Sequence, residues 1–118
     1  MSEELTALRD ALRKFAAERD WDQFQSPKNL ASALAVEAAE LLEPFQWLTE
    51  EQSRNLTPGQ LSAVREEMAD VLLYLIRLAD KLNVDLVQAA QQKIEINARK
   101  YPVEASRGSS KKYTERLE

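Results

Sequence analysis

Apolar residues recur every three or four positions along most of this chain, which is the spacing of amphipathic helices. The first stripe, in a helix predicted over residues 3–19, consists of Leu5, Leu8, Leu12 and Phe15. Ser26 and Pro27 predict the start of a second helix, because serine caps free N–H groups and proline fits a first helical turn. This helix is expected to run to about Glu43, where Pro44 stops it.

A third helix is predicted after a polar connector at residues 48–59. Thr57-Pro58 repeats the cap and proline signal, and Gln60 completes a capping box. The stripe of this helix is the longest in the chain and comprises Leu61, Val64, Met68, Val71, Leu72, Leu75, Leu78 and Leu82. We expect it to be the central helix and to end at Asn83.

A fourth helix is predicted from Asp85, its cap, to Pro102, which ends it. The remaining residues, 103–118, are basic and lack helical periodicity, so they are expected to form a tail. We therefore predict an all-α protein, an antiparallel four-helix bundle within a single domain at residues 1–102. The chain is short for one that must also enclose a substrate, which makes an oligomer plausible.

Composition narrows the chemistry that this domain can perform. The chain has no cysteine and no histidine, which excludes disulfides, thiol nucleophiles and the nitrogen or sulfur ligands of zinc, copper and haem. Any metal must be a hard cation held by oxygen. The net charge of −4 argues against a general nucleic-acid binder. No apolar run reaches membrane-spanning length and the N-terminal MSEELTALRD lacks a signal core, so we expect a cytoplasmic protein without membrane contact.

Four acidic residues lie beside apolar stripes without a basic partner. Glu37 and Glu40 share one face of the second helix, and Glu67 and Asp70 share one face of the third, because each pair is three residues apart. Salt bridges along a solvated face would be the ordinary explanation, but no Lys or Arg occurs at residues 29–53. Four carboxylates in a low-dielectric gap would repel one another by several kcal/mol as an order of magnitude, unless cations lie between them.

Magnesium is the cation that best fits this pattern. Calcium usually requires a loop of closely spaced acidic residues, and a ferritin-like di-iron site requires Glu-x-x-His; the chain has neither. Magnesium is bound by a few carboxylates and retains waters that substrate phosphates can replace. The missing ligands can therefore belong to a nucleotide.

With these residues in hand, the sequence resembles the MazG-like nucleotide pyrophosphohydrolases, and within them the dCTP pyrophosphatase branch. The family pairs E-x-x-E on one helix with E-x-x-D on the next. The resemblance covers essentially the whole chain and rests on the segments FAAERDWDQF, SPKNLASAL, EPFQW, EEMADVLLYLIRLA, KIEINARKYP and SSKKYTE. It implies a MazG-like all-α fold and a homotetramer built as a dimer of dimers.

The resemblance also implies a reaction and a site. The four carboxylates, Glu37, Glu40, Glu67 and Asp70, would be the catalytic residues and the ligands of Mg²⁺, with Mn²⁺ as a substitute. They would hydrolyse a (d)NTP, favouring dCTP or modified dCTP, to the monophosphate and pyrophosphate, which keeps unwanted nucleotides out of DNA synthesis. The substrate-binding residues would be Trp21, Gln25, Trp47, Lys93, Asn97, Lys100 and Tyr101.

Some alternatives remain open at this point. Many relatives have histidine where this chain has Gln25, and an amide cannot become cationic, so the base preference is undetermined. A solvated helix end is an alternative role for Lys100, as core packing is for Trp21 and Trp47. The rival functions are a broad-specificity NTP or dUTP-type pyrophosphatase of the same fold, and a non-catalytic nucleotide-binding oligomer.

Overall fold

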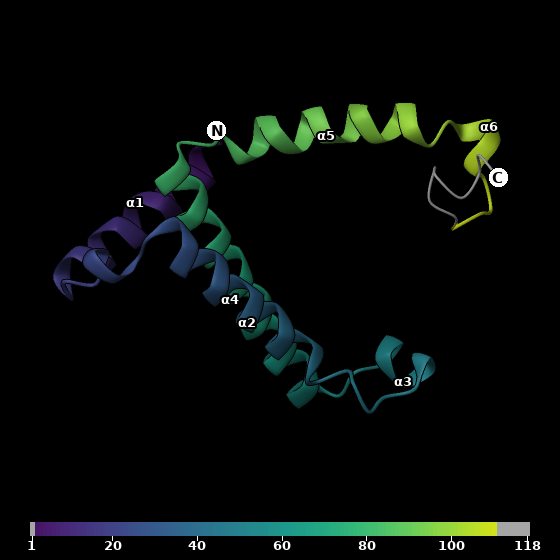
Figure 1. The fold of residues 1–118 in the computed structure, drawn as a ribbon. Coiled ribbons are helices and arrows are strands. Elements are labelled where there is room, and N and C mark those ends of the chain that lie inside the picture. The colour runs from purple at the N-terminus through teal and green to yellow at the C-terminus, as the bar shows by residue number, and fades with distance from the viewer. Residues whose placement is uncertain (1, 111–118) are drawn as a thin grey trace. The chain divides into compact units, whose positions relative to one another are not determined.

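The structure is a computed structural model that describes residues 2–110, and every regular element in this range is a helix (Figure 1). The all-α class is thus confirmed. No helix in the described part of the chain combines the length and the apolar character needed to cross a membrane. The chain separates into two compact units, one at Ser2–Val84 and one that begins at Asp85.

The first unit contains three long helices and two short ones: α1 (Glu3–Glu18), the 3₁₀ turn η1 (Asp22–Phe24), α2 (Pro27–Leu42), α3 (Glu50–Arg54) and α4 (Pro58–Leu82). Helices α2 and α4 lie side by side and antiparallel, joined by the connector that carries α3, and α1 packs against α4 (Figure 1). The 25-residue α4 is thus the central helix of this unit, as predicted.

The helix ends follow the capping residues. The Ser26 side chain accepts a hydrogen bond from the Asn29 amide at the start of α2, and Thr57 forms a capping box with Gln60 at the start of α4. Helix α4 ends at Asn83, which adopts the left-handed conformation with φ of 57°. The predicted starts of these two helices are therefore confirmed.

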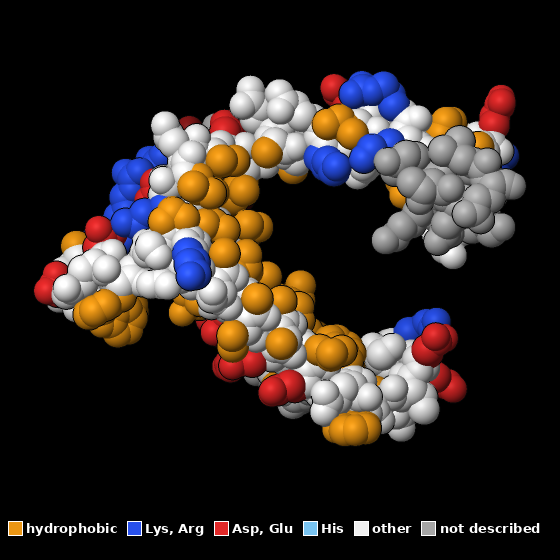
Figure 2. All heavy atoms as spheres, in the orientation of Figure 1, with side chains coloured by type: hydrophobic (Ala, Val, Ile, Leu, Met, Phe, Trp, Pro, Cys, Tyr) orange, Lys and Arg blue, Asp and Glu red, His pale blue; other side chains and the backbone are white. Residues whose placement is uncertain are grey.

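The core of the first unit is small. Its buried apolar side chains are Ala16, Leu30, Val64, Ile76 and Ala79. Five of the eight residues in the apolar stripe predicted for α4 are instead exposed: this exposed apolar face comprises Leu61, Met68, Leu72, Leu75 and Leu82. Figure 2 shows hydrophobic side chains gathered along the α2 and α4 pair.

The second unit contains α5 (Leu86–Lys100) and the short α6 (Val103–Ser106). Asp85 caps α5 as predicted, through a hydrogen bond from the Gln88 amide. Ile94 lies on the apolar side of α5 and remains 69% exposed.

The structure adds three elements to the predicted four helices. The connector contains α3, a turn of 3₁₀ helix follows α1, and the first residues after Pro102 form α6. Residues 111–118 of the predicted tail lie outside the described residues. A single domain at residues 1–102 stays a prediction, since the described chain groups into two units that divide before Asp85.

Candidate functional site

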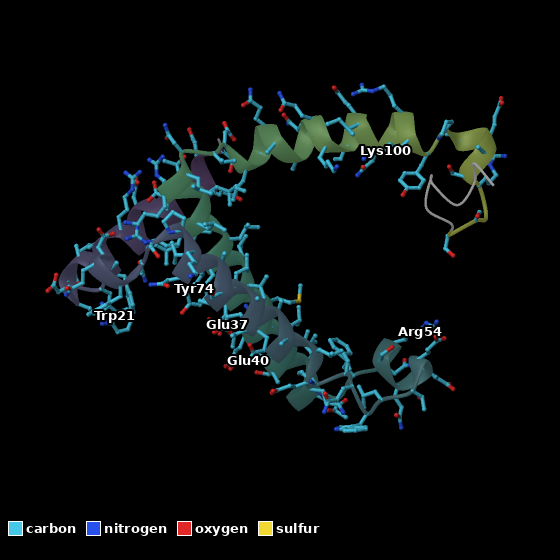
Figure 3. The ribbon with its side chains drawn as sticks, in the orientation of Figure 1. Trp21, Glu37, Glu40, Arg54, Tyr74 and Lys100 are labelled. Atoms are coloured by element: carbon cyan, nitrogen blue, oxygen red, sulfur yellow. The ribbon has the colours of Figure 1, made fainter. Side chains whose placement is uncertain are left out.

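Helices α2 and α4 bring the predicted carboxylates together. Glu37, Glu67 and Asp70 each offer a carboxylate oxygen, and these three oxygens lie within 4.8 Å of one another. Glu40 adjoins this carboxylate cluster, because its charge acts on both Glu37 and Glu67. Figure 3 shows Glu37 and Glu40 on the same side of α2, as their spacing requires. Two acidic pairs from distant parts of the sequence thus form one group.

The cluster contains buried oxygens without hydrogen-bond partners. Oε2 of Glu37 and Oε2 of Glu67 are both buried, and no group in the described part of the chain forms a hydrogen bond with either atom. None of the ion pairs found within residues 2–110 involves any of the four carboxylates. A buried carboxylate oxygen without a donor is costly, so these atoms are suited to bind a cation.

The same crowding shifts the acidity of the cluster. Burial raises the pKa of Glu37 to about 7, and a hydrogen bond with Glu40 and the charges of Glu40, Asp70 and Glu67 act in the same direction. Burial, followed by the charges of Glu40 and Asp70, also raises the pKa of Glu67. Without a cation, the cluster therefore retains a proton near neutral pH.

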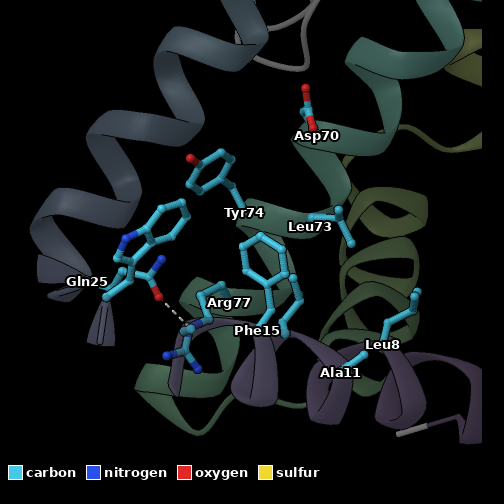
Figure 4. A pocket seen from close by; sticks show the side chains of 11 residues that line it. Leu8, Ala11, Phe15, Gln25, Asp70, Leu73, Tyr74 and Arg77 are labelled. Atoms are coloured by element: carbon cyan, nitrogen blue, oxygen red, sulfur yellow. Dashed lines mark hydrogen bonds between the residues drawn. The ribbon is translucent and has the colours of Figure 1, made fainter. Parts of the chain in front are cut away.

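A cavity of about 420 Å³ adjoins the cluster, between α1 and α4 (Figure 4). Its wall is mostly apolar, with four polar side chains. The apolar residues are Leu8, Ala11, Leu12, Phe15, Ala16, Trp21 and Leu73, and the polar ones are Gln25, Asp70, Tyr74 and Arg77. Asp70 belongs to both the cavity and the carboxylate cluster, so a ligand in the cavity would lie next to the acidic group.

The aromatic rings of Phe15 and Trp21 line this cavity. The Phe15 and Trp21 rings meet edge to face, with centroids 5.7 Å apart and an interplanar angle of 69°. The Arg19 guanidinium carbon lies 3.6 Å from the Phe15 ring centroid, on the ring face. Both side chains remain about half exposed, and Arg19 covers one face of the Phe15 ring.

The structure gathers only part of the predicted substrate-binding set. Trp21 and Gln25 line the cavity, whereas Trp47 is 85% exposed in the segment after α2 and does not line it. The remaining residues, Lys93, Asn97, Lys100 and Tyr101, belong to the second unit, where the first three lie along α5 and Tyr101 caps its end. The roles of Trp47 and of the residues on α5 stay predictions.

Sequence reasoning missed Tyr74 and Arg77, which both line the cavity. Tyr74 lies one turn beyond Asp70 on α4, so helical spacing from the acidic pair could have identified it. Arg77 interrupts the apolar run LLYLIRLA, and an arginine in such a place usually has a buried partner. It is the buried charged residue of the described chain, with 6% exposure.

Comparisons with known proteins show the family to which the chain is similar. Residues 33–115 match the model of the MazG-like family. The chain is 48% identical over 104 residues to human dCTP pyrophosphatase 1 and 49% identical to the mouse protein of that name, which covers 86% of this chain and 61% of each relative. It thus spans about three fifths of the length of these curated relatives.

A solved structure is also similar. A pyrophosphatase from Archaeoglobus fulgidus has 39% sequence identity and a TM-score of 0.80, covering 86% of this chain and 95% of that one. The structural match and the family match therefore both extend over most of the chain.

Proposed function

Since this chain belongs to the MazG-like family, we propose that it is a Mg²⁺-dependent pyrophosphohydrolase that cleaves dCTP or a modified dCTP to the monophosphate and pyrophosphate. The observation that carries this proposal is the pair of buried, unpartnered oxygens on Glu37 and Glu67, next to a cavity that shares Asp70 with them. Such a site is suited to a ligand with an anionic end and an apolar end. A cation held by the carboxylates would attract the anionic end, and the cavity would take the apolar end.

The carboxylates fit a hard cation. Glu37, Glu67 and Asp70 supply three oxygens within 4.8 Å, and Glu40 stands beside them. Oxygen donors of this kind are those that magnesium and manganese prefer. When bound, Mg²⁺ would neutralise phosphate charge and supply an activated water. Glu37 would lose the proton that it holds without metal, because a cation favours the charged form of a carboxylate.

The cavity is suited to the nucleobase. Trp21 and Phe15 offer ring faces on which a base can stack, while Gln25 and Tyr74 add polar groups. Because Asp70 lies at the boundary between cavity and cluster, a base in the cavity directs the triphosphate toward the carboxylates.

Residues of α5 are a further part of the proposed substrate-binding set. Lys93, Asn97 and Lys100 follow one another at helical spacing, and we propose that they contact phosphate and sugar, with Tyr101 beside them. Trp47 is proposed as a second aromatic contact to the base. A cytoplasmic location is part of the same proposal, since that is where the nucleotide pool is used.

We also propose that the chain forms a homotetramer, a dimer of dimers, in which a second copy covers the exposed apolar face of α4. Met68 and Leu72 on this face are 57% and 41% exposed. Monomers rarely expose contiguous apolar surface of this kind, and four of its residues, Leu61, Met68, Leu75 and Leu82, repeat every seven positions, as in helix-to-helix packing.

A product assay tests the reaction. Wild type, Glu37→Gln and Asp70→Asn would be incubated with each of the common (d)NTPs, with and without Mg²⁺, and the monophosphate and pyrophosphate separated. We expect Mg²⁺-dependent release of both products from dCTP, lost in the two variants. Similar turnover of many nucleotides would instead support the broad-specificity enzyme, and turnover of none would leave a nucleotide-binding protein.

A further inference from the structure

The orientation of the Gln25 amide is fixed by its partner. Nε of Arg77 donates a 2.7 Å hydrogen bond to Oε1 of Gln25. A guanidinium has five N–H donors and no acceptor, so only the amide oxygen can face it. The amide nitrogen must then point away from Arg77, and Figure 4 shows it on the side of Tyr74. Within residues 2–110, no group accepts a hydrogen bond from this nitrogen.

Arg77 is in turn unable to rotate. Its Nη2 donates to Oδ1 of Asp22 at 2.5 Å, and its Nη1 lies 3.4 Å from Oδ2 of Asp80. Lys81 also binds Asp22, and Arg13 also binds Asp80. Hydrogen bonding from Lys81 lowers the pKa of Asp22, and hydrogen bonding from Arg13 lowers that of Asp80, so both remain charged at neutral pH. The guanidinium is thus held on each of its edges.

The free N–H₂ of Gln25 therefore faces an otherwise apolar part of the cavity. The wall of the cavity includes Phe15 and Trp21, and its other polar side chains besides Arg77 are those of Tyr74 and Asp70. A donor in such a place favours a ligand that supplies an acceptor, because an unmatched buried polar group is costly. A ligand that presents an N–H there would meet donor against donor.

We propose that Arg77 holds Gln25 as a hydrogen-bond donor inside the cavity, and that the cavity thereby selects nucleobases whose facing edge presents acceptors. This rests on the proposed function only in taking the cavity as the base site. Cytosine offers two adjacent acceptors, its ring nitrogen N3 and its carbonyl oxygen, whereas uracil has an N–H at N3. Gln25 is the specificity-determining residue and Arg77 is a positioning residue.

Binding measurements test the donor without requiring turnover. The ligands are dCMP, dUMP and a deoxyribose 5′-monophosphate that carries a difluorotolyl ring, which stacks but accepts hydrogen bonds poorly. By calorimetry without metal, we expect wild type to bind dCMP about tenfold or more tightly than the difluorotolyl ligand. Gln25→Met removes the donor and is expected to bring these two affinities within about threefold.

Two substitutions separate the donor from the residue that orients it. Gln25→Glu keeps a partner for Arg77 but turns an acceptor toward the ligand, so we expect dCMP to bind about tenfold more weakly. Arg77→Gln can accept as well as donate, which releases the amide of Gln25 to flip. We expect this variant to bind dCMP and dUMP with more similar affinities than the wild type does. The ratio of the two affinities does not change when part of the protein is simply unfolded. Gln91→Glu, on an exposed position of α5, is the control for added charge.

The outcomes distinguish this inference from the proposed function. If wild type discriminates as expected but hydrolyses no nucleotide, the inference holds and the enzymatic proposal fails. If wild type hydrolyses dCTP but Gln25→Met retains the full preference for dCMP over the difluorotolyl ligand, the inference is wrong and the enzymatic proposal stands. If the wild type shows no preference for dCMP over the difluorotolyl ligand, the inference is wrong, and if it also hydrolyses no nucleotide, both proposals fail.

Discussion

Arg13 on α1 binds Asp80 on α4 through two parallel hydrogen bonds, 2.8 Å from Nε to Oδ2 and 2.5 Å from Nη2 to Oδ1. The Asp80 side chain is 10% exposed, whereas that of Arg13 is 51% exposed, so the pair lies at the edge of the contact between the two helices. Since the cavity lies between α1 and α4, this pair helps to fix the distance between its walls.

Replacing Arg13 with methionine should lower the melting temperature by a few degrees, because a shielded carboxylate loses its bidentate partner. Lys14→Met is the matched control, since Lys14 makes only an exposed pair with Glu18 on the same helix, and should change the melting temperature little. Thermal denaturation followed by circular dichroism measures both. Equal effects of the two substitutions would show that the Arg13 pair has no special role.

The carboxylate cluster should make the metal-free protein less stable as pH rises from 4.5 to about 7. In this window the folded state holds a proton on Glu37 that the unfolded chain, with its pKa near 4.5, has already released. Folding stability falls wherever the folded state binds more protons, so the melting temperature in EDTA should decline across this range. Glu37→Gln should flatten that decline and raise the melting temperature at pH 7.

The same Glu37→Gln substitution should reduce turnover by at least the roughly 10- to 100-fold typical of residues that only orient a metal ligand. Glu66→Gln is its control, because Glu66 is an exposed neighbour of Glu67 outside the carboxylate cluster. A gain in stability with loss of activity indicates a functional site. A gain in stability with activity intact would mean that Glu37 does not hold the catalytic metal.

Magnesium should stabilise the wild-type protein against heat. A ligand that binds only the folded state contributes about 2.7 kcal/mol at a hundred times its dissociation constant, and the gain follows its concentration. Melting temperatures measured over a Mg²⁺ titration at constant ionic strength should therefore rise. Glu67→Gln should weaken the response, because it removes one of the buried oxygens without a partner. An unchanged response in that variant would argue that magnesium binds elsewhere.

Charge on the exposed apolar face of α4 should dissociate the oligomer. Met68→Glu and Leu72→Glu would each place a carboxylate within an apolar interface, where desolvation is costly. Light scattering coupled to gel filtration should give a lower mass for both variants than for wild type. Ser62→Glu is the control, as Ser62 is exposed on another side of α4. A monomeric wild type would refute the proposed assembly directly.

Loss of the Lys100 ammonium should weaken the binding of the nucleoside triphosphate, because we propose that this group contacts phosphate. Lys100→Met should raise KM for dCTP about tenfold, and Arg99→Met, a change of the same kind at the next position of α5, should have little effect. Steady-state kinetics measure KM for dCTP in the two variants and in the wild type. An equal rise in KM in both variants would indicate a general effect of positive charge at the end of α5 and no specific role for Lys100.

Local signals accounted for most helix boundaries. Capping by Ser26, Thr57 and Asp85 is decided within four residues, so the sequence alone predicts it. The connector helix α3 was missed although Thr49 and Gln52 form the same kind of capping box as Thr57 and Gln60. It was overlooked because α3 has a single turn and no apolar stripe, so periodicity could not reveal it.

The candidate site was only partly predictable, since it depends on how helices face one another. Spacing placed Glu67 and Asp70 on one face of α4, but the approach of that face to Glu37 follows from the packing of α2 on α4. The cavity combines Phe15 of α1 with Tyr74 of α4, which no local pattern connects. The partners of Arg77 lie as far as fifty-five residues away in sequence, and their pairing required the fold.

Different sides of helix α4 contribute to different surfaces of the protein. Glu67, Asp70 and Tyr74 occupy the side of the cluster and cavity. The exposed apolar face lies roughly half a turn from Asp70, next to the buried Val64. In the first half of α4, a strip at Ser62, Glu66 and Ala69 has no assigned contact, whereas farther along the same side carries Leu73 of the cavity wall and the buried Ile76. Random substitutions along this helix should therefore differ in their effects. Neutral substitutions should be concentrated in that strip, and substitutions on the occupied sides should more often impair folding, assembly or activity.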